Sequence, residues 1–346
     1  MVAFSLSTRT GGWGMSETAN IAEVASKVSK EIFKKFGWHV QPRTDDVFEC
    51  LDATHKGGKA NTKDKKVHPT DVVFSYQDPY ADKRIYLLTD LKSYKLDSIK
   101  TGQIRSALQQ LAMAVECAQH STDWKTKFAI DQGERHSVRG MLFVHNHDGL
   151  YAKNFRDEIK KVNVRTLAMR DGVYLHYLGP DDITRLYKIA TDIKVLISDN
   201  EMSPNYTFYY PDLLMSRRVG AVWDQQATVE VLAGPFMIVK YPAIEGLAEG
   251  YMIYYNRPGG TKEEFEYLID CLSRYQILGS GARVSIRMAG AETDDDYKSN
   301  FHLAARSYAR VWGFDAVRTE QLNSLSVDRV QAYVASYNPG DCGWGD

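Results

Sequence analysis

The sequence predicts an α/β protein, in which a mixed sheet flanked by helices is followed by a smaller α+β unit. Three observations support this fold class. Two short apolar runs within residues 72–88 are separated by a turn-like segment, as in a β-hairpin. Helical stripes of apolar residues lie on both sides of this hairpin. From residue 250 onward, strand-like and helix-like patterns alternate.

The first predicted element is a helix over residues 16–36. A serine suits its N-cap, and a glycine directly follows its end. When the helix is projected at 100° per residue, Glu17 falls on the apolar face and Glu23 on the opposite face. The first strand is predicted over residues 47–53, and it carries Glu49.

The central hairpin has its apolar runs at residues 72–76 and 85–88. The residue numbers of two paired residues in a hairpin always add up to the same value, so position 71 is expected opposite position 89 or 90. Asp71 and Asp90 then become neighbours, with Lys92 on the same face as Asp90. Two neighbouring carboxylates repel each other, and such pairs often bind a divalent cation with oxygen ligands, here Mg²⁺ or Mn²⁺.

These residues also resemble a known sequence signature. The segment Pro69-Thr70-Asp71, followed by Asp90-Leu91-Lys92, is similar to the metal-binding signature of the PD-(D/E)xK nuclease superfamily. In that superfamily the first acid opens one strand, and the second acid shares the next strand with the lysine. This chain differs by a threonine between the proline and the first acid. The resemblance covers about residues 14–150.

The resemblance implies a restriction-endonuclease-like fold and a Mg²⁺-dependent deoxyribonuclease. Asp71 and Asp90 would bind one or two Mg²⁺ or Mn²⁺ ions, with the backbone carbonyl of Leu91 as a further ligand. Lys92 would orient the attacking water. The first helix of these nucleases commonly supplies an additional glutamate, which here would be Glu17.

Two alternatives stay open for the third acid. Glu17 lies near the start of its predicted helix, where a carboxylate stabilises the helix dipole without any role at a metal. Glu49, on the first predicted strand, is the second candidate for the ligand.

A lysine-rich loop is predicted at residues 55–66, directly before the first acid of the hairpin. It contains five lysines, two glycines and one acid. These lysines are candidates for contacts with DNA phosphates, although a solvated surface loop has the same composition. The five candidates are Lys56, Lys59, Lys63, Lys65 and Lys66.

The remaining elements of the first half follow from apolar periodicity. A helix is predicted over residues 103–119, and the resemblance makes Gln103 a candidate for placing DNA, with a plain polar flank as the alternative. A strand follows at residues 138–145. A hairpin is predicted over residues 164–178, around an Asp-Gly turn, and a helix over residues 180–197.

Residues 1–200 are therefore predicted to form a nuclease-like domain, and residues 201–346 a second domain. Strands are expected at residues 229–232 and 236–241, before the alternating strands and helices. This order predicts a ferredoxin-like α+β unit. Its predicted role is to bind a partner, form a dimer or position DNA.

Charge is distributed unevenly along the chain. The net charge is −1, but residues 1–200 hold 30 Lys and Arg against 25 Asp and Glu, whereas residues 201–346 hold 13 against 19. The half of the chain with the net positive charge is also the half that contains Asp71, Asp90 and Lys92. Excess positive charge there is consistent with DNA as the partner.

The four cysteines are scattered along the sequence without a CxxC pair, so neither a zinc site nor a disulfide framework is predicted. No apolar run approaches the roughly 20 residues of a membrane span, and the N-terminus lacks the apolar core of a secretory signal. A protein of the cytoplasm without membrane contact is expected.

The function predicted from these features is hydrolysis of DNA phosphodiester bonds, in bacterial anti-phage defence, together with a second protein subunit or as a homo-oligomer. The alternative is a non-catalytic nucleic-acid-binding scaffold subunit that keeps the nuclease fold. An intact set of two acids and a lysine favours the enzyme.

Overall fold

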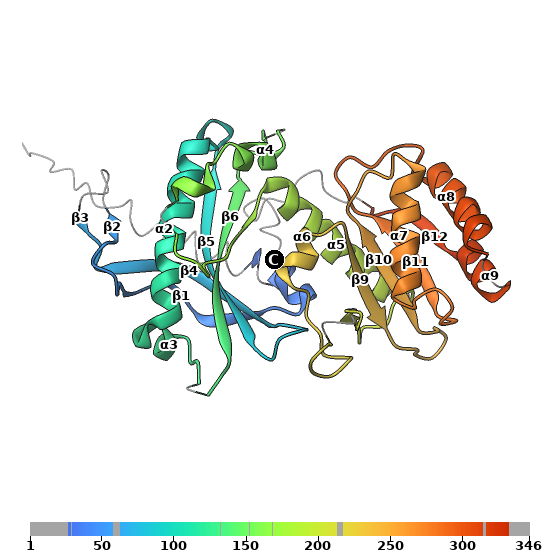
Figure 1. Cartoon of the computed structure of the whole chain (residues 1–346), viewed down its shortest axis with the longest axis horizontal. Helices are drawn as coiled ribbons and strands as arrows, with labels where there is room; N and C mark the ends of the chain where they lie inside the picture. Colours follow the sequence, from blue (N-terminus) through green and yellow to red (C-terminus); the bar gives the residue numbers. More distant parts are fainter. Residues whose placement is uncertain are drawn as a thin grey trace, which may run out of the picture.

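Two five-stranded sheets form the centre of the molecule (Figure 1). Helix α5 (Pro180–Ser198) lies between them, so the layers run from α2 through the first sheet, α5 and the second sheet to α7 and α8. The computed structural model describes residues 27–331, except for residues 29, 58–62, 132, 152, 168, 213–216 and 314–315.

The first sheet has the strand order β1-β4-β5-β6-β7. Strand β4 is antiparallel to both of its neighbours, whereas β5, β6 and β7 run parallel, which makes the sheet mixed as predicted. Its strands are β1 (His39–Glu49), β4 (Val67–Gln77), β5 (Arg84–Tyr94), β6 (His136–Asn146) and β7 (Leu175–Leu178). Helix α2 (Thr101–His120) crosses over between the parallel strands β5 and β6, as parallel pairing requires.

Both faces of the first sheet are buried at its central strands β4 and β5. Alternate residues of β4 and β5 point to opposite faces, so Val73 and Leu88 pack with α2, whereas Phe74 and Leu87 pack in the cluster that contains α5. Consecutive apolar residues are therefore required in both strands. This explains why each strand has a continuous apolar run instead of a strict alternation.

The second sheet has the order β12-β11-β10-β9-β8 and is covered by helices on its outer face. Its strands are β8 (Thr207–Phe208), β9 (Phe236–Tyr241), β10 (Gly250–Tyr255), β11 (Arg283–Met288) and β12 (Ser326–Arg329). Its helices are α7 (Lys262–Arg274), α8 (Tyr297–Trp312) and α9 (Ala316–Ser324).

The predicted second sheet region is present, but its connections differ from the ferredoxin-like prediction. Strands β10, β11 and β12 are direct parallel neighbours joined by helices. In a ferredoxin-like unit another strand separates the two strands of each βαβ unit. A pattern of alternating elements does not reveal which strands become neighbours, so these two strand orders cannot be distinguished from the sequence.

Short elements connect the larger ones. The short strands are β2 (Lys56–Gly57) and β3 (Lys63–Asp64), and the short helices are η1 (Phe33–Phe36), η2 (Leu96–Ser98), α3 (Thr122–Lys127), α4 (Phe155–Lys160), η3 (Val164–Thr166) and α6 (Val229–Ala233). No helix among the described residues is long and apolar enough to cross a membrane.

Three predicted elements are wrong in detail. The first strand is β1 at His39–Glu49, not residues 47–53; its side chains are mostly exposed, so it lacks a hydrophobic signature. The predicted strand at residues 229–232 is helix α6, which Thr228 caps by accepting a hydrogen bond from the Val231 amide at 3.2 Å. In the described part of residues 164–178, the first arm of the predicted hairpin contains helix η3, and β7 pairs in parallel with β6.

The helices predicted at residues 103–119 and 180–197 are confirmed as α2 and α5. Most of the predicted helix at residues 16–36 lies outside the described residues. The domain boundary near residue 200 stays a prediction, because one core cluster includes Leu186 of α5, Phe74 of the first sheet and Val239 of the second.

Gly140 of β6 lies directly beneath Leu111 of α2, without room for a side chain. A Cβ atom there would lie 2.8 Å from Leu111 Cγ and 2.6 Å from Leu175 Cδ2. We expect Gly140→Ala to lower the free energy of unfolding by about 1–3 kcal/mol through overpacking. Gly102→Ala is the control, because a Cβ there meets nothing within 4 Å and alanine favours the helix. Denaturant unfolding that shows equal stabilities would contradict this packing.

Candidate active site

Two acidic side chains meet where β4 and β5 pair. The antiparallel register aligns Val72 with Thr89, which places Asp71 next to Asp90, as predicted. An Asp71 carboxylate oxygen, Oδ2, accepts a hydrogen bond from the Leu91 amide at 2.6 Å. The first acid is therefore held by the backbone of the strand that carries the second acid.

The two carboxylates influence each other electrostatically. Burial raises the pKa of Asp71 to about 6, and the neighbouring charge of Asp90 adds to this shift. The hydrogen bond from the Leu91 amide and the charge of Lys92 act in the opposite direction. Negative charge at Asp71 is therefore only partly compensated by the protein itself, which is the electrostatic condition of a cation-binding site.

Lys92 provides part of the missing positive charge. Its Nζ lies 2.5 Å from Asp90 Oδ1. Burial disfavours the charged amine, but the carboxylates of Asp90 and Asp71 outweigh burial, so the pKa of Lys92 is raised above its ordinary value. Lys92 is thus a protonated amine in the metal-free protein.

A cavity of about 360 Å³ opens between the hairpin and helix α2, beside the two acids. Two further predicted residues, Lys65 and Gln103, line it. Lys65 Nζ donates a hydrogen bond to the side chain of Gln110, which lies seven residues after Gln103 on α2. The complete polar lining is Lys65, Thr89, Asp71, Asp90, Lys92, Tyr94, Gln103, Ser106 and Gln110.

Gln110 and Tyr94 belong to this cavity although the sequence did not single them out as site residues. Both were accessible to sequence reasoning through periodicity. Gln110 lies seven residues after Gln103 on the same flank of the helix, and Tyr94 lies two residues after Lys92 on the same face of the strand.

Several other predicted residues do not line the cavity. Lys56 is paired with Asp64 at 2.5 Å, and the side chains of Lys63 and Lys66 are exposed. Glu49 is exposed at the end of β1, opposite Val67. The predicted residues Glu17 and Lys59 lie outside the described residues.

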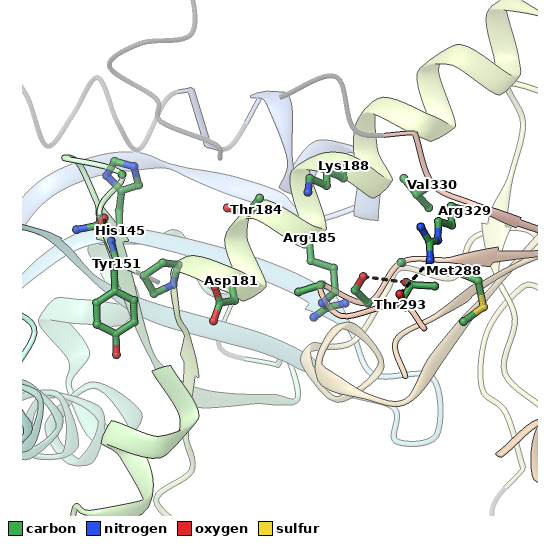
Figure 2. A pocket seen from close by; sticks show the side chains of 16 residues that line it. His145, Tyr151, Asp181, Thr184, Arg185, Lys188, Met288, Thr293, Arg329 and Val330 are labelled. Atoms are coloured by element: carbon green, nitrogen blue, oxygen red, sulfur yellow. Dashed lines mark hydrogen bonds between the residues drawn. The ribbon is translucent and has the colours of Figure 1, made fainter. Parts of the chain in front are cut away.

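A larger cavity, of about 520 Å³, lies between α5, the end of β6 and the second sheet (Figure 2). Arg185, Lys188 and Arg329 line it, together with Asp181. Arg329 donates a hydrogen bond to the Thr293 carbonyl at 3.0 Å. Asp181 is the only acidic side chain among the described residues that line this cavity, so its size alone does not make it the reactive site.

The donor set beside the smaller cavity fits a hard divalent cation. Asp71 and Asp90 offer carboxylate oxygens from adjacent strands, without a sulfur or imidazole ligand among the residues that line the cavity. Oxygen-only sites suit Mg²⁺ and Mn²⁺ rather than zinc or copper. The raised pKa of Asp71 shows that an additional positive charge there would be favourable.

Comparison with known proteins agrees with this geometry. Residues 15–182 match the family described as GAPS4 protein PD-(D/E)XK nuclease domain. This part of the chain is a PD-(D/E)XK nuclease domain. No curated protein and no solved structure gave a match.

The match confirms the superfamily that the acid, acid and lysine signature indicated. The match extends beyond residue 150, where the resemblance noted in the sequence ends, so it also includes β7 and the first turn of α5. The second sheet lies outside the match. The nuclease domain therefore contains the carboxylates, Lys92 and the cavity, whereas the role of the second sheet stays a prediction.

Burial of Asp71 beside the charge of Asp90 is expected to lower the stability of the folded protein at neutral pH. The pKa of Asp71 is about 6 in the folded protein, above the roughly 3.9 of an unfolded aspartate. The stabilising protonated form is fully present below about pH 4 and is lost as the pH rises through about 6. We expect Asp71→Asn to raise the Tm at pH 7.5 in buffer without divalent cations, by about 2–4 °C per kcal/mol of relieved repulsion.

The difference in Tm between Asp71→Asn and the wild type should disappear as the pH falls to about 4. Added Mg²⁺ should raise the Tm of the wild type more than that of the variant. Thermal unfolding at several pH values tests this. An Asp71→Asn variant that is less stable than the wild type at every pH would contradict the proposed repulsion.

Proposed function

We propose that this protein is a metal-dependent deoxyribonuclease that hydrolyses phosphodiester bonds. The observation that carries the proposal is the convergence of Asp71, Asp90 and Lys92 on one cavity within a PD-(D/E)XK nuclease domain. Hydrolysis of a phosphodiester requires a deprotonated water and neutralisation of the negative charge that develops on the phosphate. Two acids and a lysine meet these two requirements together.

Asp71 and Asp90 would hold one or two Mg²⁺ or Mn²⁺ ions. A bound ion would supply Lewis-acid stabilisation of the phosphate and a lower pKa for a bound water. Glu17 and the backbone carbonyl of Leu91 are the proposed additional ligands. The hydrogen bond from the Leu91 amide to Asp71 would keep the first carboxylate in a fixed orientation.

Lys92 would orient the water and stabilise the charge of the phosphate, since its amine already lies at the edge of the cavity next to Asp90. Lys65 and Gln103, which line the same cavity, would bind the phosphate backbone of DNA. The positive charge of the first half would attract the nucleic acid.

As the biological setting we propose bacterial anti-phage defence with a second protein subunit, since this nuclease fold is used there. A non-catalytic scaffold would have no physical reason to keep two repelling carboxylates beside a cavity, because removing one of them would stabilise the fold.

We expect Asp71→Ala, Asp90→Ala and Lys92→Ala each to slow cleavage of DNA in saturating Mg²⁺ by at least about a hundredfold. Their side chains act on charge at the reacting phosphate, so the variants should stay folded. Cleavage of linear, nicked, circular and single-stranded DNA by the purified protein provides the measurement.

Asp328→Asn is the matched control, because it removes an acid of the second sheet that pairs with Lys298 at 2.9 Å, outside the nuclease domain. It should cleave at the wild-type rate. The proposed site is wrong if two of the three variants keep most of the wild-type rate.

The lysines of the loop are expected to bind phosphate without reading sequence. Lys65→Gln should reduce the slope of log affinity against log salt by about 0.9 on duplex DNA, the value for one lost phosphate contact. Lys56→Gln should have a smaller effect, because Asp64 already neutralises Lys56. Binding titrations at several salt concentrations measure the slopes. An unchanged slope after all five loop lysines are replaced would exclude the loop from the DNA interface.

A further inference from the structure

Four side chains with metal-binding atoms meet at the edge of the first sheet, outside the candidate active site. One ligand atom from each of them lies within 4.8 Å of the others. They come from separate places in the sequence: the end of β1, the loop before β2, strand β4 and helix α2. The four residues are Cys50, His55, His68 and Cys117.

The distances match those between the ligands of a tetrahedral zinc ion. His55 Nδ1 lies 3.4 Å from Cys50 Sγ and 3.5 Å from Cys117 Sγ, and the two sulfur atoms are 3.9 Å apart. Zinc–sulfur and zinc–nitrogen bonds at tetrahedral angles place sulfur and nitrogen about 3.5 Å apart, and two sulfurs about 3.8 Å apart. Three of the four side chains therefore already have the separations of zinc ligands, and a ring nitrogen of the fourth, His68, lies within 4.8 Å of their ligand atoms.

His68 supplies a second, independent observation. Its side chain is completely buried, and within the described part of the chain neither ring nitrogen has a hydrogen-bond partner. Buried polar atoms without a partner are costly and uncommon. The ring meets that of His55 edge-on, with centroids 5.4 Å apart. A metal ion in the cluster would satisfy one of its nitrogens.

His55 also has the outer partner that zinc-binding histidines commonly have. While Nδ1 faces the two sulfurs, Nε2 lies 3.1 Å from Glu116 Oε2. Glu116 is itself fixed, because its other oxygen accepts a hydrogen bond from the Arg170 amide at 2.9 Å. A carboxylate behind a histidine orients the ring and makes the ligand more basic.

We propose that Cys50, His55, His68 and Cys117 bind one structural Zn²⁺ ion. Two thiolates and two imidazoles are a common ligand set of structural zinc sites, and four protein ligands leave no position open for substrate. The sulfur ligands also favour zinc over the Mg²⁺ or Mn²⁺ proposed for the acids. The zinc site is independent of the proposed nuclease activity.

A zinc ion at this position would stabilise the surroundings of the candidate active site. Its ligands would join helix α2 and strand β4 to the loop that carries Lys65. His68 lies three residues before Asp71 on β4, and Cys117 lies seven residues after Gln110 on α2. The ion would therefore hold the loop lysine close to the cavity without taking part in hydrolysis.

Metal content of the full-length protein, purified under reducing conditions, tests the proposal. We expect about one zinc per chain by elemental analysis, and less than about a tenth of that in Cys117→Ser and His68→Ala. Cys271→Ser is the matched control, since it removes another buried cysteine outside the cluster. Asp90→Asn distinguishes the two metal sites, because it should keep its zinc.

A measurement on the wild type covers the case in which a ligand variant fails to fold. Replacement of zinc by Co²⁺ should give the visible bands of a tetrahedral site and a thiolate charge-transfer band, which weakens in Cys50→Ser. The proposal is overturned if the wild type binds neither Zn²⁺ nor Co²⁺. It is also overturned if Cys50 and Cys117 form a disulfide in the metal-free native protein, or if Asp90→Asn loses the zinc while Cys117→Ser keeps it.

Discussion

Antiparallel hydrogen bonding between β4 and β5 determines the position of almost every other part of the nuclease domain. The pairing of Val72 with Thr89 fixes which side chains face α2 and which face α5, because a shift by one residue would exchange the two faces. The same register brings Asp71 next to Asp90 at the end of the paired segment. Core packing and the candidate active site are therefore set by one alignment of two strands.

This alignment places like charges together, and the fold tolerates them at a cost. Lys92 compensates part of the charge through Asp90, and the Leu91 amide stabilises Asp71. The pKa of Asp71 nevertheless remains raised, so compensation by the protein is incomplete. A stable protein that only needed this hairpin for packing would gain by losing one acid. The remaining imbalance is the electrostatic basis of our proposal that this site binds a cation.

Helix α2 connects the two proposed metal sites. Gln103, Gln110 and Cys117 follow one another at intervals of seven residues, so they lie along one side of the helix. The first two line the cavity beside the acids, and the third belongs to the cluster with His55. The apolar side of α2 packs on the first sheet, where Gly140 allows the helix to approach closely. Packing of α2 thus positions both groups of polar residues at once.

The sequence by itself determined the features that depend on local periodicity. The central hairpin follows from two apolar runs separated by a turn, and the shared face of Asp90 and Lys92 follows from a period of two. Helices α2 and α5 follow from the spacing of their apolar residues. The superfamily followed from residues within one hairpin. These features could be predicted because each involves residues that are near one another in the chain.

Only the tertiary structure decided which residues that are far apart in the sequence lie close together in space. The proposed zinc site was not predicted from the sequence, because Cys50 and Cys117 are 67 residues apart and become neighbours only when α2 packs beside the end of β1. The sequence placed five lysines near the acids, but only Lys65 was found in the cavity among those described. It also misassigned β1 and the order of the second sheet. Exposed edge strands and parallel neighbours leave no local pattern, since their partners are chosen by packing in three dimensions.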